Sequence, residues 1–304
     1  MKKLLLLTLG CFSLLLSACG TEDGGPGTIS TTAPMEAKYS TTDGIIPFPN
    51  NILIFGGPGP VDGTLDIVIN NPADPKEAPK VAMNTLDGFS TVAPITTTFG
   101  LPIDATTITS TSVRVFEVAT APITSGYAVT NIANELVFGV QFKALPSPSN
   151  ANILVIKPVK ALKSNTQYMV VVTNALKSTS GEAARSSAFF TLLKNTSPLV
   201  DGTGASQVPG RDDATAAKLE GLRQLTQAML GVAGTATPAI AAADVAVAWS
   251  FKTQTLNKVL PKILADIGTE PYSNSAGNFV TPAVAPSAGS GGLGISIRCY
   301  FCSS

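Results

Sequence analysis

The sequence predicts a mainly β protein, a β-sandwich followed by a short helical C-terminal part. Between residues 94 and 200, short apolar runs are separated by turn residues, a spacing typical of sandwiches. One run, 112–118, alternates apolar and polar residues, which indicates a half-buried strand. Two others, 153–156 and 168–172, are continuously apolar, as in buried strands. We expect a last strand at 189–191.

The first eighteen residues have the pattern of an export signal. Lys2 and Lys3 form a positive start, an apolar run follows, and small residues lead up to Cys19. The order Leu-Ser-Ala-Cys resembles the lipobox of bacterial lipoproteins, which implies lipidation of Cys19 and attachment to a membrane. The alternatives are an ordinary signal peptide cut after Ala18 and a membrane helix, but the run is shorter than the roughly 20 residues that a spanning helix needs. In a Gram-negative host, Gly20 after the cysteine favours the outer membrane by the same resemblance.

Composition argues against several function classes. The chain of 304 residues contains no His, which is the usual proton acceptor of serine hydrolases and the commonest ligand of catalytic zinc. Its 20 basic and 20 acidic residues balance, whereas nucleic-acid binding needs an excess of Lys and Arg. We therefore predict no catalytic residue, cofactor, metal or nucleic-acid partner for this chain alone.

Two segments precede the sandwich. Residues 19–36 are rich in Gly, Ser and Thr and are predicted to be a flexible tether. Residues 37–93 form a β-rich segment with strand and turn signals at 45–55 and 65–69. The Asp-Gly pairs at 43–44 and 62–63 suit turns with positive φ, and three prolines at 72–79 disfavour a helix there.

A helix–strand–helix segment is predicted over 201–270. Leucines at 219, 222 and 225, with Met229 and Val232, have helical spacing, and Gly231 and Gly234 are expected to end that helix. Residues 245–251 alternate like a strand, with Trp249 in the core. A second apolar stripe covers 256–267, interrupted by Pro261. Residues 271–304 consist largely of Gly, Ser, Ala and Pro and are predicted to be unstructured.

Longer stretches of the chain resemble known families. Residues 99–116 and 156–191 resemble a bacterial immunoglobulin-like module, in which 165–168 enters a strand, Ser180 and Gly181 close a hairpin, and 189–191 ends the sandwich. The segments DGIIPFPNN (43–51), DGTL (62–65), AMNTLDGFST (82–91) and WSFKTQ (249–254) together resemble the N-terminal region of bacterial virulence-factor lipases. This second resemblance covers residues 39–267.

The lipase resemblance implies an exported lipase or lysophospholipase lipoprotein in which this region precedes an α/β-hydrolase domain. It does not carry over catalysis, because the sequence has neither His nor the Gly-x-Ser-x-Gly elbow. We predict that the chain alone is inactive. Whether it is a truncated or frameshifted lipase or a genuine short form stays open, as does a free-standing surface lipoprotein with an adhesion or ligand-binding module. A downstream hydrolase domain is the expected contact partner.

Other candidate sites have simpler structural interpretations. Cys299 and Cys302 form a lone Cys-x-x-Cys, and Ser290 lies in a Gly/Ser linker. The carboxylates at 62, 66, 74 and 87 lack the spacing of a calcium loop and are expected to form turns, as is Asp104. Trp249 and Phe251 are predicted to be core residues rather than the lining of a lipid groove.

Overall fold

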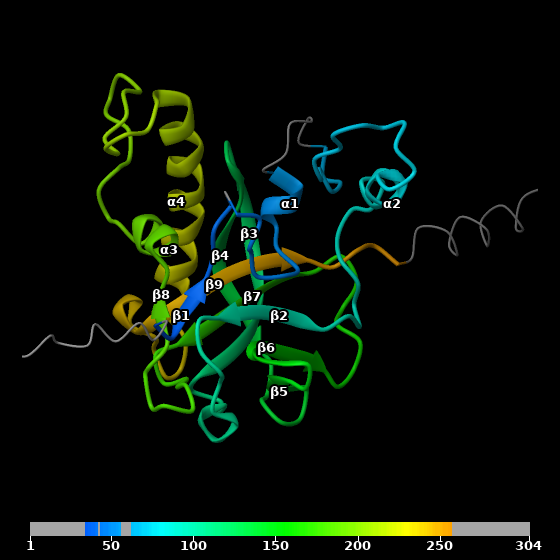
Figure 1. The fold of residues 1–304 in the computed structure, drawn as a ribbon, viewed down its shortest axis with the longest axis vertical. Helices are drawn as coiled ribbons and strands as arrows, with labels where there is room; N and C mark the ends of the chain where they lie inside the picture. Colours follow the sequence, from blue (N-terminus) through cyan, green and yellow to red (C-terminus); the bar gives the residue numbers. More distant parts are fainter. Residues whose placement is uncertain (1–33, 42, 56–61, 257–304) are drawn as a thin grey trace, which may run out of the picture. The chain divides into compact units, whose positions relative to one another are not determined.

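Two β-sheets face each other in this protein (Figure 1). The computed structural model describes residues 34–41, 43–55 and 62–256, and those after Pro34 belong to one compact unit. The mainly β sandwich predicted from the sequence is confirmed. The predicted signal peptide, nearly all of the tether, the apolar stripe after Leu256 and the tail lie outside the described residues.

The first sheet has five strands in the order β5-β6-β2-β1-β8. Its strands are β1 (Glu36–Lys38), β2 (Ile95–Phe99), β5 (Phe142–Ser147), β6 (Asn150–Pro158) and β8 (Arg185–Ser186). All neighbours are antiparallel except β1 and β8, which run parallel. Strand β1 therefore joins the start of the described chain to residues almost 150 positions later in the sequence.

The second sheet has four antiparallel strands in the order β4-β3-β7-β9. They are β3 (Val113–Ile123), β4 (Gly126–Glu135), β7 (Gln167–Thr173) and β9 (Val245–Lys252). Strand β9 confirms the strand predicted from the alternation of 245–251. Because β1 lies before residue 94 and β9 after residue 200, the two sheets draw strands from all three parts of the predicted body.

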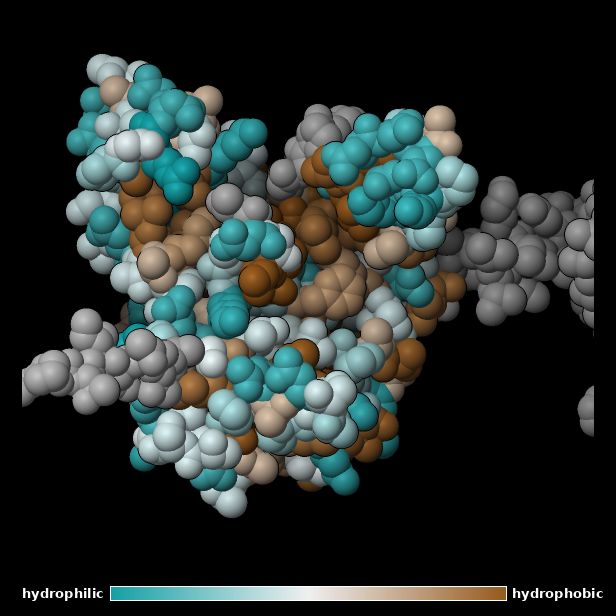
Figure 2. Space-filling view, viewed as in Figure 1, coloured by the Kyte–Doolittle hydropathy of each residue, from teal (hydrophilic) through white to brown (hydrophobic). Residues whose placement is uncertain are grey.

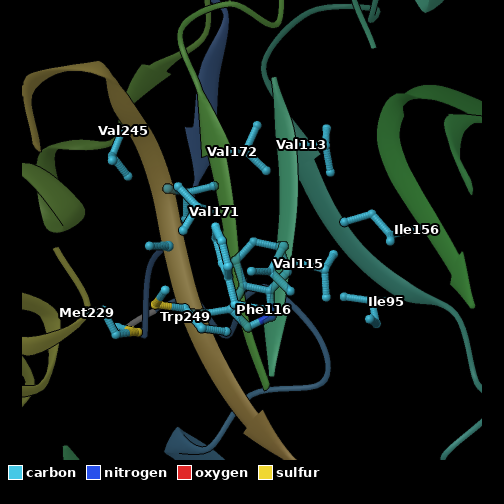
Figure 3. Packing of buried hydrophobic residues seen from close by; sticks show 14 of the residues in the cluster. Ile95, Val113, Val115, Phe116, Ile156, Val171, Val172, Met229, Val245 and Trp249 are labelled. Carbon is cyan, nitrogen blue, oxygen red and sulfur yellow. The ribbon is translucent and has the colours of Figure 1, made fainter. Parts of the chain in front are cut away.

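The core lies between the two sheets. Figure 3 shows Val113 and Val115 of β3 projecting toward Ile95 of β2 and Ile156 of β6. Cross-strand register places Val115 beside Val170, and Val170 beside Trp249, so all three side chains share this inner face. Trp249 is 1% exposed, which confirms its predicted place in the core.

The helix α4 (Asp213–Ala233) covers the outer face of the four-stranded sheet. It contacts both β4 and β9, the two edge strands, and so crosses the whole face (Figure 1). Asp212 caps its start by accepting a hydrogen bond from the Thr215 N–H. The helix continues through Gly231 and ends before Gly234. The prediction that Gly234 ends the helix is confirmed, and the prediction that Gly231 does so is wrong.

Strand β3 does not alternate in burial at residues 113–116, because side chains on the outer face of its sheet are buried as well. Arg114 and Phe116 point away from the sandwich interior but are 4% and 0% exposed. The Arg114 guanidinium lies over the Phe116 ring, 5.0 Å from its centroid. The Arg114 guanidinium makes a bidentate ion pair with Glu135, with both N···O distances 2.7 Å. It also donates to the carbonyls of Thr237 and Pro238, which follow α4.

Two short helices lie where the sequence predicts strands. Residues 189–191 lie in α3 (Ala188–Leu193), not in a strand; the Ser187 hydroxyl caps this helix, and Phe190 and Leu193, one turn apart, are buried. Residues 52–55 form α1 (Ile52–Phe55), whose Ile52 N–H is bonded by the Asn50 side chain.

The prolines at 72–79 are expected to disfavour a helix, but a short helix forms at the last of them. The helix α2 (Ala78–Met83) holds Pro79 in its first turn, where no intrahelical N–H is needed. Residues 65–69 lie in no strand. Gly44 and Gly63 have φ of 67° and 88°, as the Asp-Gly turns require, and Gly181 closes its predicted turn at 87°. Two 3-10 helices, Ala105–Thr107 and Ala242–Asp244, complete the described elements.

A buried ion pair joins α4 to the segment before it. The Glu220 carboxylate accepts two hydrogen bonds from Arg223, each 2.7 Å, and one from the Leu199 N–H. Arg223 also donates to the carbonyls of Asn195 and Thr196. The hydrogen bonds from Arg223 lower the pKa of Glu220 from 4.5 to about 2, although burial opposes this change.

We predict that Glu220→Gln lowers the free energy of unfolding by about 2–3 kcal/mol at neutral pH, because Arg223 loses its buried partner. The native carboxylate has a lowered pKa, so its contribution is complete above pH 4.5 and is lost as the pH falls toward about 2. Urea unfolding at several pH values measures this. The difference from wild type should shrink over that window, while Asp43→Asn, in an exposed loop, should follow wild type throughout.

Candidate functional site

Three of the segments that carry the lipase resemblance meet along the outer edge of β9. The Asn51 N–H donates to the Ser250 carbonyl at 2.8 Å. Further along the strand, the Phe89 N–H donates to the Lys252 carbonyl, and the Gln254 N–H donates to the Phe89 carbonyl, each at 2.8 Å. Segments 43–51, 82–91 and 249–254, distant in the sequence, therefore form one structural unit around the last residues of the described chain.

The chain beyond β9 is held by a set of side-chain hydrogen bonds. The Asp87 carboxylate accepts from the Thr255 N–H at 3.0 Å and from its hydroxyl at 2.6 Å. The Ser164 hydroxyl donates to the Gln254 carbonyl and accepts from the Leu256 N–H at 2.8 Å. We call this set of residues the exit clasp: Asp87, Gly88, Phe89, Ser164, Thr253 and Thr255.

Gly88 makes the exit clasp sterically possible. A Cβ atom on this residue would lie 2.7 Å from the Gln254 nitrogen and 2.8 Å from the Lys252 oxygen. Both are backbone atoms of the segment that Phe89 pairs with, so neither can move without breaking that pairing. Thr253 secures the other side, since its buried hydroxyl donates to the Lys163 carbonyl at 2.6 Å.

Exposed apolar side chains surround the exit clasp. Leu86 precedes Asp87 and is 40% exposed, while Leu256 follows Thr255 and is 48% exposed. Phe48 is 39% exposed, and its ring meets the Phe89 ring edge-on, with 5.5 Å between the ring centroids. We call Phe48, Leu86 and Leu256 the exit patch. Figure 2 shows hydrophobic atoms between α4 and the region of α1 and α2 on the face that it draws.

The candidate calcium carboxylates are dispersed. Asp62 bonds Thr64, and Asp74 bonds the Lys76 N–H, each two residues ahead, as in Asx turns. Asp87 instead accepts hydrogen bonds from Thr255, 168 residues away, a role that no local sequence signal indicates. In the described part of the chain, no three His, Cys, Asp or Glu side chains could together hold a metal.

Asp104 behaves as the turn residue predicted. It caps a 3-10 helix, and hydrogen bonds from the Thr106 hydroxyl and N–H lower the pKa of its carboxyl. Phe251 is fully buried and stacks with Tyr168, so it and Trp249 are core residues rather than a lipid groove. The other candidates, Cys19, Ser290, Cys299 and Cys302, lie outside the described residues.

One serine–lysine pair invites comparison with a Ser-Lys dyad. The Lys194 ammonium lies 3.4 Å from the Ser186 hydroxyl, and partial burial lowers the pKa of Lys194. Both groups, however, donate to the same carbonyl oxygen, that of Val245. A dyad needs the serine hydroxyl to donate to a neutral amine. This arrangement instead ties α3 and β8 to the first residue of β9.

A family model described as bacterial virulence factor lipase N-terminal matches residues 33–208. The chain belongs to this family. No curated protein matches the chain.

The family match ends before β9, although β9 completes the four-stranded sheet. The virulence-factor lipase N-terminal region of this protein thus extends structurally to the exit clasp. Among the described residues, no helix is both long and apolar enough to cross a membrane. The exit clasp and exit patch are the features of this region that bear on the chain that follows.

We predict that Gly88→Ala lowers the free energy of unfolding by about 1–3 kcal/mol, because the added methyl group meets backbone atoms that cannot yield. Gly202→Ala is the matched control, since a Cβ there meets nothing within 4 Å, and its effect should stay within about 0.5 kcal/mol. Chemical denaturation measures both variants. Equal stability of the two would contradict the role assigned to Gly88.

Proposed function

We propose that the chain serves as the non-catalytic N-terminal region of a bacterial lipase or lysophospholipase anchored at the outer membrane. The observation that carries this proposal is the family match over residues 33–208, together with an exit clasp that fixes where the chain leaves the sandwich. In this arrangement the sandwich holds a hydrolase domain near the membrane and supplies none of its reacting groups.

The lack of catalytic groups supports an accessory role. The 304-residue sequence has no His and no Gly-x-Ser-x-Gly, so the usual base and the strained serine turn of an α/β-hydrolase are both missing. The Ser186–Lys194 pair does not replace them, because both groups donate to the Val245 carbonyl.

Anchoring is assigned to Cys19. Its position after Leu-Ser-Ala supports lipid attachment at the residue that becomes the mature N-terminus, and two or more acyl chains bind a bilayer stably. The Gly, Ser and Thr residues between Cys19 and β1 are suited to a tether. The sandwich would then stand off the membrane by the length of this segment.

The exit patch is the surface that a following hydrolase domain meets first. Leu86 and Leu256 each adjoin one member of the Asp87–Thr255 pair, and both are exposed together with Phe48. A domain joined to the chain beyond Leu256 starts from this apolar rim. Contact there removes Phe48, Leu86 and Leu256 from water and favours a fixed orientation of the two domains.

We predict background esterase activity for the purified chain alone. A nitrophenyl ester and a lysophospholipid are suitable substrates, and a form extended by any hydrolase domain encoded downstream is the positive comparison. The expected result is activity in the extended form only, because acyl transfer needs a base and an oriented serine. Turnover by the chain alone, with labelling by a serine-reactive fluorophosphonate, would falsify the proposed function.

We predict that Cys19→Ser abolishes lipidation and moves the protein from the outer-membrane fraction to precursor or soluble material. Cys11→Ser, within the same predicted signal, is the matched control and should leave both lipidation and fractionation unchanged. Metabolic labelling with a palmitate analogue, followed by membrane fractionation, measures this. Wild-type labelling of Cys19→Ser would rule out the anchor.

A further inference from the structure

A hollow of about 250 Å³ lies at the end of the four-stranded sheet that α1 covers. Strands β3, β4, β7 and β9 all contribute side chains to it, and α1 and the Asp62-Gly63 turn complete its wall. Its lining residues are Ile54, Gly63, Thr120, Tyr127, Asn165, Gln167 and Lys252. The described lining residues with polar side chains are Thr120, Tyr127, Asn165, Gln167 and Lys252; each carries a hydrogen-bond donor, and none of these described residues carries a carboxylate.

Lys252 supplies the positive charge of the hollow. Among the described lysines, three are half-buried: Lys80, Lys194 and Lys252. Lys80 pairs with Glu77, and Lys194 donates to the Val245 carbonyl. The Lys252 ammonium makes no hydrogen bond or ion pair within the described residues, so it lines the hollow as an uncompensated cation.

The amide of Gln167 is held in a donating orientation. Its Oε1 accepts a 2.9 Å hydrogen bond from the side chain of Asn51. Asn51 is 3% exposed and is itself bonded to Ser250 through both its backbone N–H and its side chain. Because the oxygen of Gln167 is thus occupied, its NH₂ group is left to bind a ligand in the hollow.

The remaining donors are also placed by the fold. Asn165 has a positive φ of 50° and is held by its N–H donating to the Gln254 carbonyl at 3.1 Å. The Tyr127 ring packs against the Phe55 ring, with 5.7 Å between the ring centroids. Asp62, which precedes Gly63 in the chain, accepts two hydrogen bonds from Thr64. Lys163 is paired with Glu117.

We propose that this hollow binds the phosphate group of a phosphate ester. A phosphate has several acceptor oxygens and a negative charge, which match one ammonium group, two amides and two hydroxyls. The Ile54 side chain and the Tyr127 ring provide an apolar surface for the organic part of the ester. This site does not rest on the proposed function, since it is built from the sandwich itself.

The test uses the full chain purified in detergent, with binding measured by isothermal titration calorimetry. Glycerol 3-phosphate is the probe, inorganic phosphate tests the anion alone, and glycerol is the blank. We expect glycerol 3-phosphate and phosphate to bind and glycerol not to bind. Lys252→Met should weaken binding about tenfold or more, because a charge-assisted hydrogen bond is lost, whereas Lys252→Arg should retain it.

Two further variants keep the test decisive. Lys157→Met, which removes an exposed lysine on β6, should bind like wild type. Thr120→Val removes one donor at nearly constant volume and should weaken binding severalfold even if Lys252→Met fails to fold. Absence of binding at millimolar phosphate ester, equal binding of glycerol, or equal effects of Lys252→Met and Lys157→Met would each overturn the proposal.

A comparison with a short-chain lysophosphatidic acid identifies the source of the phosphate. Tighter binding of the acylated ligand than of glycerol 3-phosphate assigns the hollow to a lipid headgroup. Equal or weaker binding of the acylated ligand assigns it to a soluble phosphate ester. Either result supports phosphate recognition, provided that both ligands lose affinity in Lys252→Met.

Discussion

The pairing of β9 with β7 is the constraint on which the rest of this structure depends. Seven residue pairs join the two strands, from Gln167 with Lys252 to Thr173 with Val245. This ladder brings residues after α4 back into the sheet and places Trp249 in the core. The outer edge of β9 then provides the backbone groups to which Asn51 and Phe89 bond. Without β9, segments 43–51 and 82–91 lose their common support.

Burial on both faces explains the composition of the four-stranded sheet. The inner face packs on the five-stranded sheet, and α4 crosses the outer face between its edge strands. The outer face therefore has small residues, Ala246 and Ala248, on β9. Where a charge is buried there, as at Arg114, a bidentate partner compensates for its desolvation. Gly221 lets α4 approach Ser125 in the β3–β4 turn, since a Cβ would lie 2.5 Å from its hydroxyl.

Local patterns predicted β3, β6, β7, β9 and α4. The remaining strands and the site depend on contacts between residues that are distant in the sequence. The continuous apolar run at 168–172 and the alternation at 245–251 are each long enough to identify a strand. Residues 189–191 are too few to show a period, and the cap from Ser187 decides for a helix. The bond between Asp87 and Thr255 spans 168 residues and leaves no local signal. The hollow leaves no local signal either, because its lining residues come from before, within and after residues 94–200.

Lys252 connects the hollow with the exit clasp. Its carbonyl accepts the hydrogen bond from Phe89, while its side chain lines the hollow. Its neighbour Thr253 is bonded to the carbonyls of Lys163 and Thr166, and Asn165 is bonded to Gln254. The loop 163–166 therefore contacts both the hollow and the departing chain. A ligand bound by Lys252 and Asn165 would therefore contact residues that are hydrogen-bonded to the exit clasp and to Gln254. Through Thr253 and Asn165, the hollow and the exit clasp thus share contiguous hydrogen bonds.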